Sequence, residues 1–219
     1  MNSTSQRLGR PRKGSVDKRQ AIVDAARTVF GRVGYLGASI DLIAAEAEVS
    51  TRTIYNHFAN KEKLFATTVS ESSEHVAATH IEIIERHLRD DLTAADLEKA
   101  LVGLAKEWLR SDAAIAEHTA LVGRIPAESK ELPPELVAAW RESGPARVQR
   151  ALAGQLASLG ERRLLRIDDP AIAAQHYIVL ITNRWTSGAG GTTEPSHEQI
   201  DANAETGVHT FLYGHLPGR

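Results

Sequence analysis

The sequence predicts an all-α protein of about nine helices, and three observations support this prediction. Aromatic residues make up 5% of the 219 residues, whereas alanine and leucine are abundant, and this composition favours helices over strands. Apolar residues recur at three- and four-residue spacing in successive stretches of the chain. Glycine, proline and small polar residues separate these stretches at the places where helices begin or end.

The charge distribution divides the chain into unlike parts. Residues 1–65 carry 11 lysines and arginines against 6 aspartates and glutamates, a net charge of +5. Residues 66–219 carry 15 against 22, a net charge of −7. A basic part joined to an acidic one is typical of a phosphate-binding module attached to a different module. We expect a basic arm over 1–14, a small phosphate-binding domain over 15–60 and a helical domain over 61–219.

Composition and spacing also argue against several classes of protein. The chain has no cysteine, so disulfides, thiolate catalysis and cysteine-ligated zinc are excluded. No apolar run approaches the ~20 residues of a membrane span, and no secretory signal is apparent, so we expect a cytoplasmic protein without a membrane partner. His80 and His87 are two helical turns apart, too far to share a metal ion. No glycine-rich phosphate loop or nucleophile motif occurs, so neither an enzyme nor a cofactor is expected.

The basic arm begins the chain. Gly9-Arg10-Pro11 looks like the core of an AT-hook, with Arg12 close behind, and such an arm places arginine in a narrow minor groove. A disordered tail that only improves solubility is the alternative. Ser15 or Asp17 then opens a helix that runs to about Val33. Its apolar stripe consists of Ile22, Ala25, Ala26, Val29, Phe30 and Val33, and Gly34 is expected to end it as a left-handed cap.

Residues 39–63 contain two short helices separated by a tight turn. Ser39 and Ser50 are suitable N-caps, and Ile54 and Phe58 lie four residues apart on the inner side of the second helix. Polar side chains remain on its outer side, and they suit base edges and phosphates. This arrangement is that of a helix-turn-helix. The outward residues are Thr51, Arg52, Thr53, Tyr55, Asn56 and His57.

This segment resembles the TetR family of transcriptional regulators. The matching residues are Ser39, Ile43-Ala44, Ala47-Glu48-Val49-Ser50, Ile54-Tyr55-Asn56-His57-Phe58, and Lys61 with Leu64. Glu48 replaces the family's turn glycine at a position that favours positive φ. Arg52 stands where the family often has glycine, so we expect base readout there to be particular to this protein. The resemblance implies DNA contacts from Ser39, Ser50, Thr51, Arg52, Thr53, Tyr55, Asn56, His57 and Lys61, with Arg10 and Arg12 added from the arm.

The remaining chain is expected to be helical. Asn60 caps a long helix over Lys61 to about Leu88, and Thr93 caps the next. Further helices are expected over 112–122, from Pro133-Pro134, over 146–159, from Asp169-Pro170 to about Trp185, and over 197–216.

Ser143–Val148 and Asp169-Pro170 resemble the ligand-binding domain of the AefR-like subgroup of this family. The resemblance implies a small-molecule effector and a homodimer formed through the last two helices. The candidates for effector contacts are Trp108, His118, Trp140, His176, Tyr177 and Asn183.

These features predict a homodimeric, sequence-specific repressor that a small-molecule effector releases from a palindromic double-stranded DNA operator. An activator of the same family is the first alternative. The others are a helical enzyme or carrier that does not read DNA, and an architectural DNA binder that uses only the basic arm.

Overall fold

The fold is all-helical in the computed structural model, which describes residues 13–110, 113–123, 125–128, 130, 132–186 and 196–216. No strand occurs in these ranges, which confirms the predicted class, and none of their helices is long and apolar enough to cross a bilayer. The eleven helices found there are α1 (Lys13–Gly37), α2 (Ile40–Glu46), α3 (Thr51–His57), α4 (Lys61–His87), α5 (Leu97–Leu109), α6 (Ala113–Val122), α7 (Ile125–Glu128), α8 (Pro134–Ser143), α9 (Pro145–Glu161), α10 (Pro170–Thr186) and α11 (His197–His215).

The chain separates into two compact units. The first, which we call the head, contains the residues up to Glu71 together with Glu117–Leu136. The second, the body, contains Ser72–Ala116 and Val137–Arg219. The segment 117–136 therefore folds with the N-terminal helices, although more than forty residues separate it from them in the sequence.

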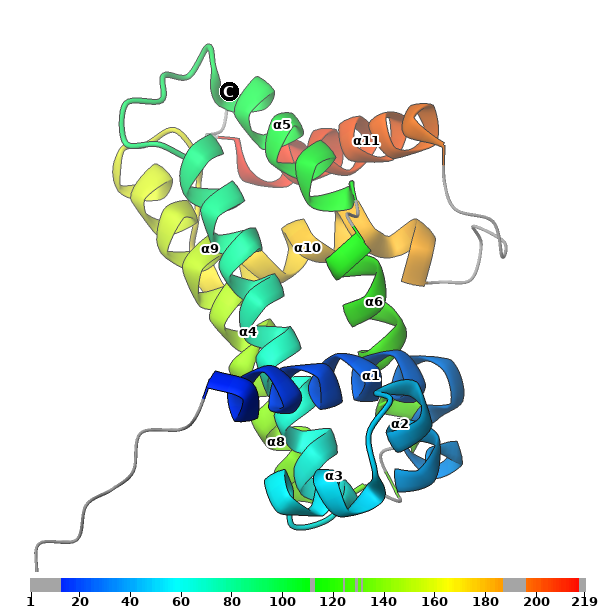
Figure 1. The fold of residues 1–219 in the computed structure, drawn as a ribbon. Coiled ribbons are helices and arrows are strands. Elements are labelled where there is room, and N and C mark those ends of the chain that lie inside the picture. The colour runs from blue at the N-terminus through cyan, green and yellow to red at the C-terminus, as the bar shows by residue number, and fades with distance from the viewer. Residues whose placement is uncertain are drawn as a thin grey trace, which may run out of the picture. The chain divides into compact units, whose positions relative to one another are not determined.

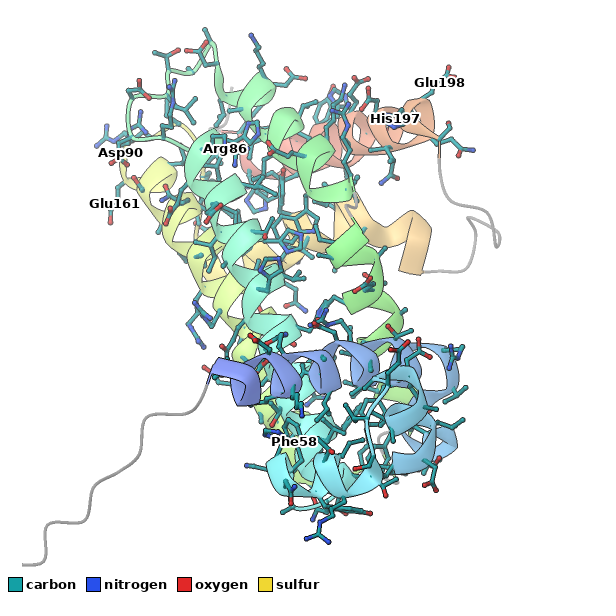
Figure 2. All side chains as sticks on the ribbon, in the orientation of Figure 1. Phe58, Arg86, Asp90, Glu161, His197 and Glu198 are labelled. Atoms are coloured by element: carbon teal, nitrogen blue, oxygen red, sulfur yellow. The ribbon has the colours of Figure 1, made fainter. Side chains whose placement is uncertain are left out.

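The head is built on the apolar stripe of α1. Ile22 and Phe30 are buried there, and α2 and α3 pack against α1 through Ile43 and Ile54 (Figure 1). Phe58, at the end of α3, is also buried, and the guanidinium of Arg19 lies 5.6 Å from the centre of its ring (Figure 2). Burying a large apolar side chain contributes roughly 1.5–3 kcal/mol, so this small core holds α3 in place.

The segment 117–136 is fastened to α1 by polar contacts. Arg27 forms ion pairs with Asp24 at 3.0 Å and with Glu117 of α6 at 3.6 Å. Glu128 of α7 accepts a hydrogen bond of 2.9 Å from the backbone amide of Tyr35. These contacts join helices that are distant in sequence, which is why the sequence did not indicate them.

The body is organised around α10, which packs against both α9 and α11, while α5 packs along α11 (Figure 1). Leu101, Leu152 and Val208 are fully buried in its core. Ion pairs tie α5 to α11 at the surface: Lys106 to Glu205 at 2.7 Å, and Arg110 to Asp201 at 3.3 Å. At the end of α4, Arg86 and His87 both donate hydrogen bonds to Glu107 of α5. These bonds, the one from His87 foremost, lower the pKa of the Glu107 carboxyl.

Three local expectations differ from the structure. Gly34 has the predicted left-handed backbone (φ 77°), but helical structure resumes after this kink and α1 ends at Gly37. Thr93 does not cap α5. Its hydroxyl donates instead to the carboxylate of Asp96 at 2.6 Å, and the helix begins at Leu97 after a turn. The short helix α7 was not predicted, because Pro126 suggested only the end of the preceding helix.

We expect Gly207→Ala to destabilise the protein, because α10 and α11 cross very closely at this residue. A Cβ atom on Gly207 would lie 2.7 Å from the carbonyl oxygen of Leu180 and 3.0 Å from its carbonyl carbon. Backbone atoms cannot move aside easily, so we expect a loss of about 1–3 kcal/mol in the free energy of unfolding, measured by urea denaturation.

Gly214→Ala is the matched control in the same helix. A Cβ there has nothing within 4 Å, so alanine should be neutral or should stabilise α11 by up to about 1 kcal/mol. Equal effects of the two substitutions would contradict a close crossing at Gly207.

Candidate nucleic-acid interface

The turn between α2 and α3 is a Schellman motif. The amide of Glu48 donates to the carbonyl of Ala45 at 3.3 Å, and the amide of Val49 donates to that of Ala44 at 3.0 Å. Glu48 has φ 53°, so the positive φ expected at this position is confirmed. This pair of hydrogen bonds satisfies carbonyls at the end of α2 and sets the direction in which the chain enters α3.

Both short helices have the predicted N-caps. The Ser39 hydroxyl accepts from the amide of Leu42 at 3.2 Å, and the Ser50 hydroxyl accepts from that of Thr53 at 3.2 Å. The hydroxyls of Ser50 and Thr53 also lie 2.9 Å apart and are hydrogen-bonded to each other. A side-chain cap contributes about 1 kcal/mol, which matters for helices of seven residues that are too short to be stable alone.

The outer face of α3 is open to solvent. Arg52, Tyr55 and Asn56 are exposed, and Tyr55 retains 55% of its accessible surface, so its ring is not packed in the core. Thr51, Thr53 and His57 are half-buried on the same short helix. A guanidinium, a phenol and an amide thus project together from the first two turns, the part of a recognition helix that reaches base edges in known complexes. Arg10 and Arg12 lie outside the described residues.

Lys61 has an internal role that the sequence did not indicate. Its ammonium donates to the backbone carbonyls of Tyr35 at 2.9 Å and Ala38 at 3.0 Å, and lies 4.3 Å from the centre of the Tyr35 ring. It therefore fastens the start of α4 to the end of α1. Burial, with a smaller contribution from the charge of Glu62, raises the pKa of Tyr35. These two bonds use two of the three N–H donors of the ammonium, so one donor is left for a phosphate.

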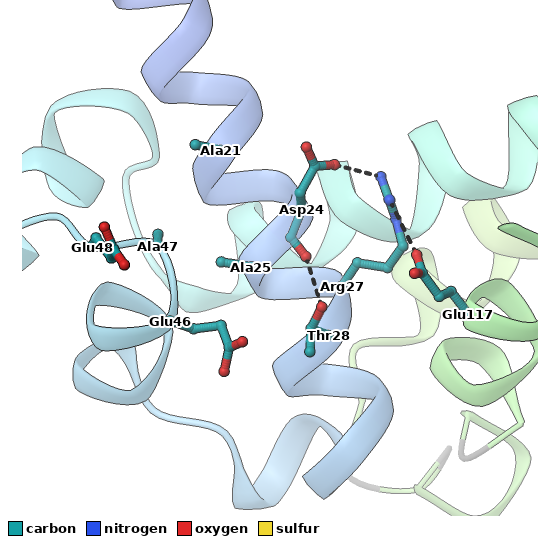
Figure 3. A pocket seen from close by; sticks show the side chains of 9 residues that line it. All are labelled: Ala21, Asp24, Ala25, Arg27, Thr28, Glu46, Ala47, Glu48 and Glu117. Carbon is teal, nitrogen blue, oxygen red and sulfur yellow. Dashed lines mark hydrogen bonds and ion pairs between the residues drawn. The ribbon is translucent and has the colours of Figure 1, made fainter. Parts of the chain in front are cut away.

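An acidic cleft of about 540 Å³ lies elsewhere on the head (Figure 3). Asp24, Glu46, Glu48 and Glu117 line it together with one basic residue, Arg27, which is already paired with two of these carboxylates. Because four carboxylates outnumber one guanidinium, the cleft repels a phosphate group. The cleft is therefore unsuited to DNA, in contrast to the outer face of α3.

The candidate effector residues differ in burial and in the unit to which they belong. Trp108 and Trp140 are half-buried in the body, and His118 is half-buried in the segment that folds with the head. His176 is exposed on α10 rather than turned inward. The side chain of Asn183 is outside the part that the structure describes.

Tyr177 differs from its predicted role. Its side chain is fully buried, and its hydroxyl donates to the carbonyl of Leu101 at 2.7 Å. The ring packs edge-on against Phe211 at 5.4 Å, and burial raises the pKa of the phenol well above 10. Tyr177 is thus a hydrogen-bonded core residue that joins α10 to α5, and not a residue available to an effector.

Comparison with known proteins links the two units to regulators. Residues 22–68 match the family model described as bacterial regulatory proteins of the tetR family, and residues 109–214 match that of the AefR-like transcriptional repressor C-terminal domain. The chain is 26% identical over 199 residues to the HTH-type transcriptional repressor AcnR of Corynebacterium efficiens, an alignment that covers 88% of this chain and 93% of that protein.

Two solved structures are similar over nearly the whole length. One is a TetR-family transcriptional regulator from Mesorhizobium loti, with a TM-score of 0.78 and 26% identity, covering 94% of this chain and all of that one. The other is the flavonoid-responsive regulator FrrA, with a TM-score of 0.66 and 29% identity, covering 93% of this chain and all of that one.

We expect Glu48→Gly to stabilise the head. A non-glycine residue in the left-handed region costs roughly 1–2 kcal/mol, and glycine removes this strain while gaining some entropy in the unfolded chain. The net gain should be about 0.5–1 kcal/mol, seen as a higher midpoint of thermal unfolding. Ala45→Gly, at an exposed position inside α2, is the control and should destabilise by about 1 kcal/mol. A loss of stability in Glu48→Gly would contradict the strain.

Proposed function

Because the chain belongs to the TetR family of transcriptional regulators, with an AefR-like C-terminal domain, we propose that it is a sequence-specific repressor that a small molecule releases from its operator. The observation that carries the proposal is the outer face of α3, where Arg52, Tyr55 and Asn56 project from a capped helix on a packed three-helix head. The repressor name of the AcnR relative supports the direction of regulation.

In this proposal α3 enters the major groove. The guanidinium of Arg52 can take O6 and N7 of guanine together, and Asn56 can pair with N6 and N7 of adenine. Ser39, Ser50 and Thr51 contact phosphates or base edges near the helix starts, and Tyr55 reaches a phosphate. Thr53 and His57 complete the contact face. Arg10 and Arg12 extend it into the adjacent minor groove.

In this proposal the protein is a homodimer, so two copies of α3 read two equivalent half-sites. The operator is therefore palindromic. The outer side of the last two helices supports this assembly. Ile172 and Val179 on α10 are 49% and 50% exposed, and Tyr213 on α11 is 76% exposed. The single chain leaves these large side chains in water, whereas a twofold partner on the last two helices would cover them.

The effector is a small molecule that binds in the body. The similarity to FrrA, which is a flavonoid-responsive regulator, supports a response of this kind. Within the body, Trp108 and Trp140 remain as candidates for effector contacts after Tyr177 is assigned to the core. The protein acts in the cytoplasm, where the operator lies, and has no catalytic role. Among the described residues no group of three or more histidines and carboxylates could hold a metal ion.

A gel-shift titration tests the proposal, with the intergenic DNA beside the protein's own gene as the target. Wild-type protein should retard this DNA in preference to unrelated DNA. Arg52→Ala should relax the preference by about 1–3 kcal/mol, because the bidentate contact with guanine is lost. Arg150→Ala, which removes an exposed arginine of the body, should leave the preference unchanged.

No retardation of any nearby intergenic DNA at low salt would count against the repressor. Binding that survives Arg52→Ala unchanged and fails when residues 1–14 are removed would instead favour a sequence-indifferent binder that uses the arm.

A further inference from the structure

Ser73 and Trp140 each carry a buried polar group that has no hydrogen-bond partner among the described residues. The two groups are the hydroxyl of Ser73 on α4 and the indole N–H of Trp140 on α8. Ser73 as a whole is 1% exposed. An indole N–H can only donate, and a buried donor without an acceptor costs about 1–3 kcal/mol. Such groups are rare in folded proteins, so we expect each one to bind a hydrogen-bonding partner such as a ligand or a water molecule.

The two groups lie in the same part of the body. Gly144 lies against Ser73, since a Cβ on Gly144 would be 3.1 Å from the Ser73 Cβ and 3.6 Å from its hydroxyl oxygen. Gly144 joins α8 to α9, and its amide donates to the carbonyl of Trp140, four residues earlier, at 3.3 Å. The end of α8 therefore meets Ser73 about one helical turn, roughly 6 Å, from Trp140.

The buried neighbours of Ser73 on α4 carry no charge. Val76 and Ala77, on the next turn, are buried, and Ser72 is 6% exposed. His80, two turns along the same helix, stacks on the ring of Trp108 at 4.3 Å between centroids. No lysine, arginine, aspartate or glutamate among the described residues is buried, so the interior offers no fixed charge to neutralise a charged guest.

We propose that Ser73 and Trp140 form the polar end of the effector site, and that the effector is an uncharged molecule with an apolar body and an acceptor oxygen such as a ketone carbonyl. The inference rests on the proposed function and specifies the chemistry of its ligand. The carbonyl oxygen accepts from the indole N–H and from the serine hydroxyl, while the apolar body lies against small side chains of α4. A carboxylate fits the site poorly, because its charge would lose solvation without a buried cation.

Three matched probes test the proposal on the full-length protein: naphthalene, 2-acetylnaphthalene and 2-naphthoate. In equilibrium dialysis the ketone should bind about tenfold more tightly than the hydrocarbon, because it adds two hydrogen bonds, and the carboxylate should bind more weakly than the ketone. The advantage of the ketone should disappear in the double variant Ser73→Ala, Trp140→Phe, while its affinity for naphthalene is retained. Thr210→Ala, which removes an exposed hydroxyl on α11, should keep the advantage.

A second measurement, the NMR signal of the Trp140 indole N–H, is made on the wild-type protein. The chain has three tryptophans, and the indole N–H resonance of Trp140 can be assigned by its loss in Trp140→Phe. This resonance should move downfield when the ketone is added, and more than it does with naphthalene. Equal affinity for the ketone and the hydrocarbon, binding of neither, or an unmoved Trp140 resonance would overturn the proposal and leave internal water as the partner of both groups.

Gel shifts on the same proteins separate the two proposals. The double variant should still retard operator DNA at low salt, because α3 is unchanged. If the wild-type protein binds no DNA, the proposed repressor function is refuted, whereas the preference for the ketone is still tested by the dialysis. Retained DNA binding without a preference for the ketone would refute only the effector assignment.

Discussion

The direction in which α3 leaves α2 depends on the left-handed backbone of one residue, Glu48. The two hydrogen bonds of its Schellman turn lie directly before the Ser50 cap, so the end of one helix and the start of the next are determined within six residues. Each helix has only seven residues and would not be stable alone. The exposed side chains of α3 are thus presented in a defined direction because the turn and the buried Ile43 and Ile54 hold their backbone.

Local features were predicted from the sequence with good accuracy. The caps at Ser39, Ser50 and Asn60 involve amides three residues away, so their chemistry is visible in the sequence itself. The positive φ of Glu48 followed from the residue type that similar proteins use at that turn. The limits of a helix were less certain where two residues could each be the N-cap. Thr93 was predicted to cap α5, but Asp96 occupies the N-cap position.

The contacts that depend on tertiary structure could not be predicted. Lys61 and Glu128 are ordinary charged residues in the sequence, and only the folded head shows that both bind backbone groups near the end of α1. Tyr177 and Ser73 illustrate the same limit in the body. Both are buried hydroxyls, but one has an acceptor from another helix and the other has none, and no pattern in the sequence distinguishes them.

The acidic cleft gives the head two surfaces of opposite electrostatic character. A duplex that approaches with its phosphates toward Asp24, Glu46 and Glu117 meets repulsion, whereas the side chains of α3 offer donors. Repulsion of wrong orientations contributes to discrimination as much as attraction in the right one. If the head binds DNA as proposed, the cleft therefore disfavours unproductive encounters before any base is read, which matters where non-specific sites far outnumber the operator.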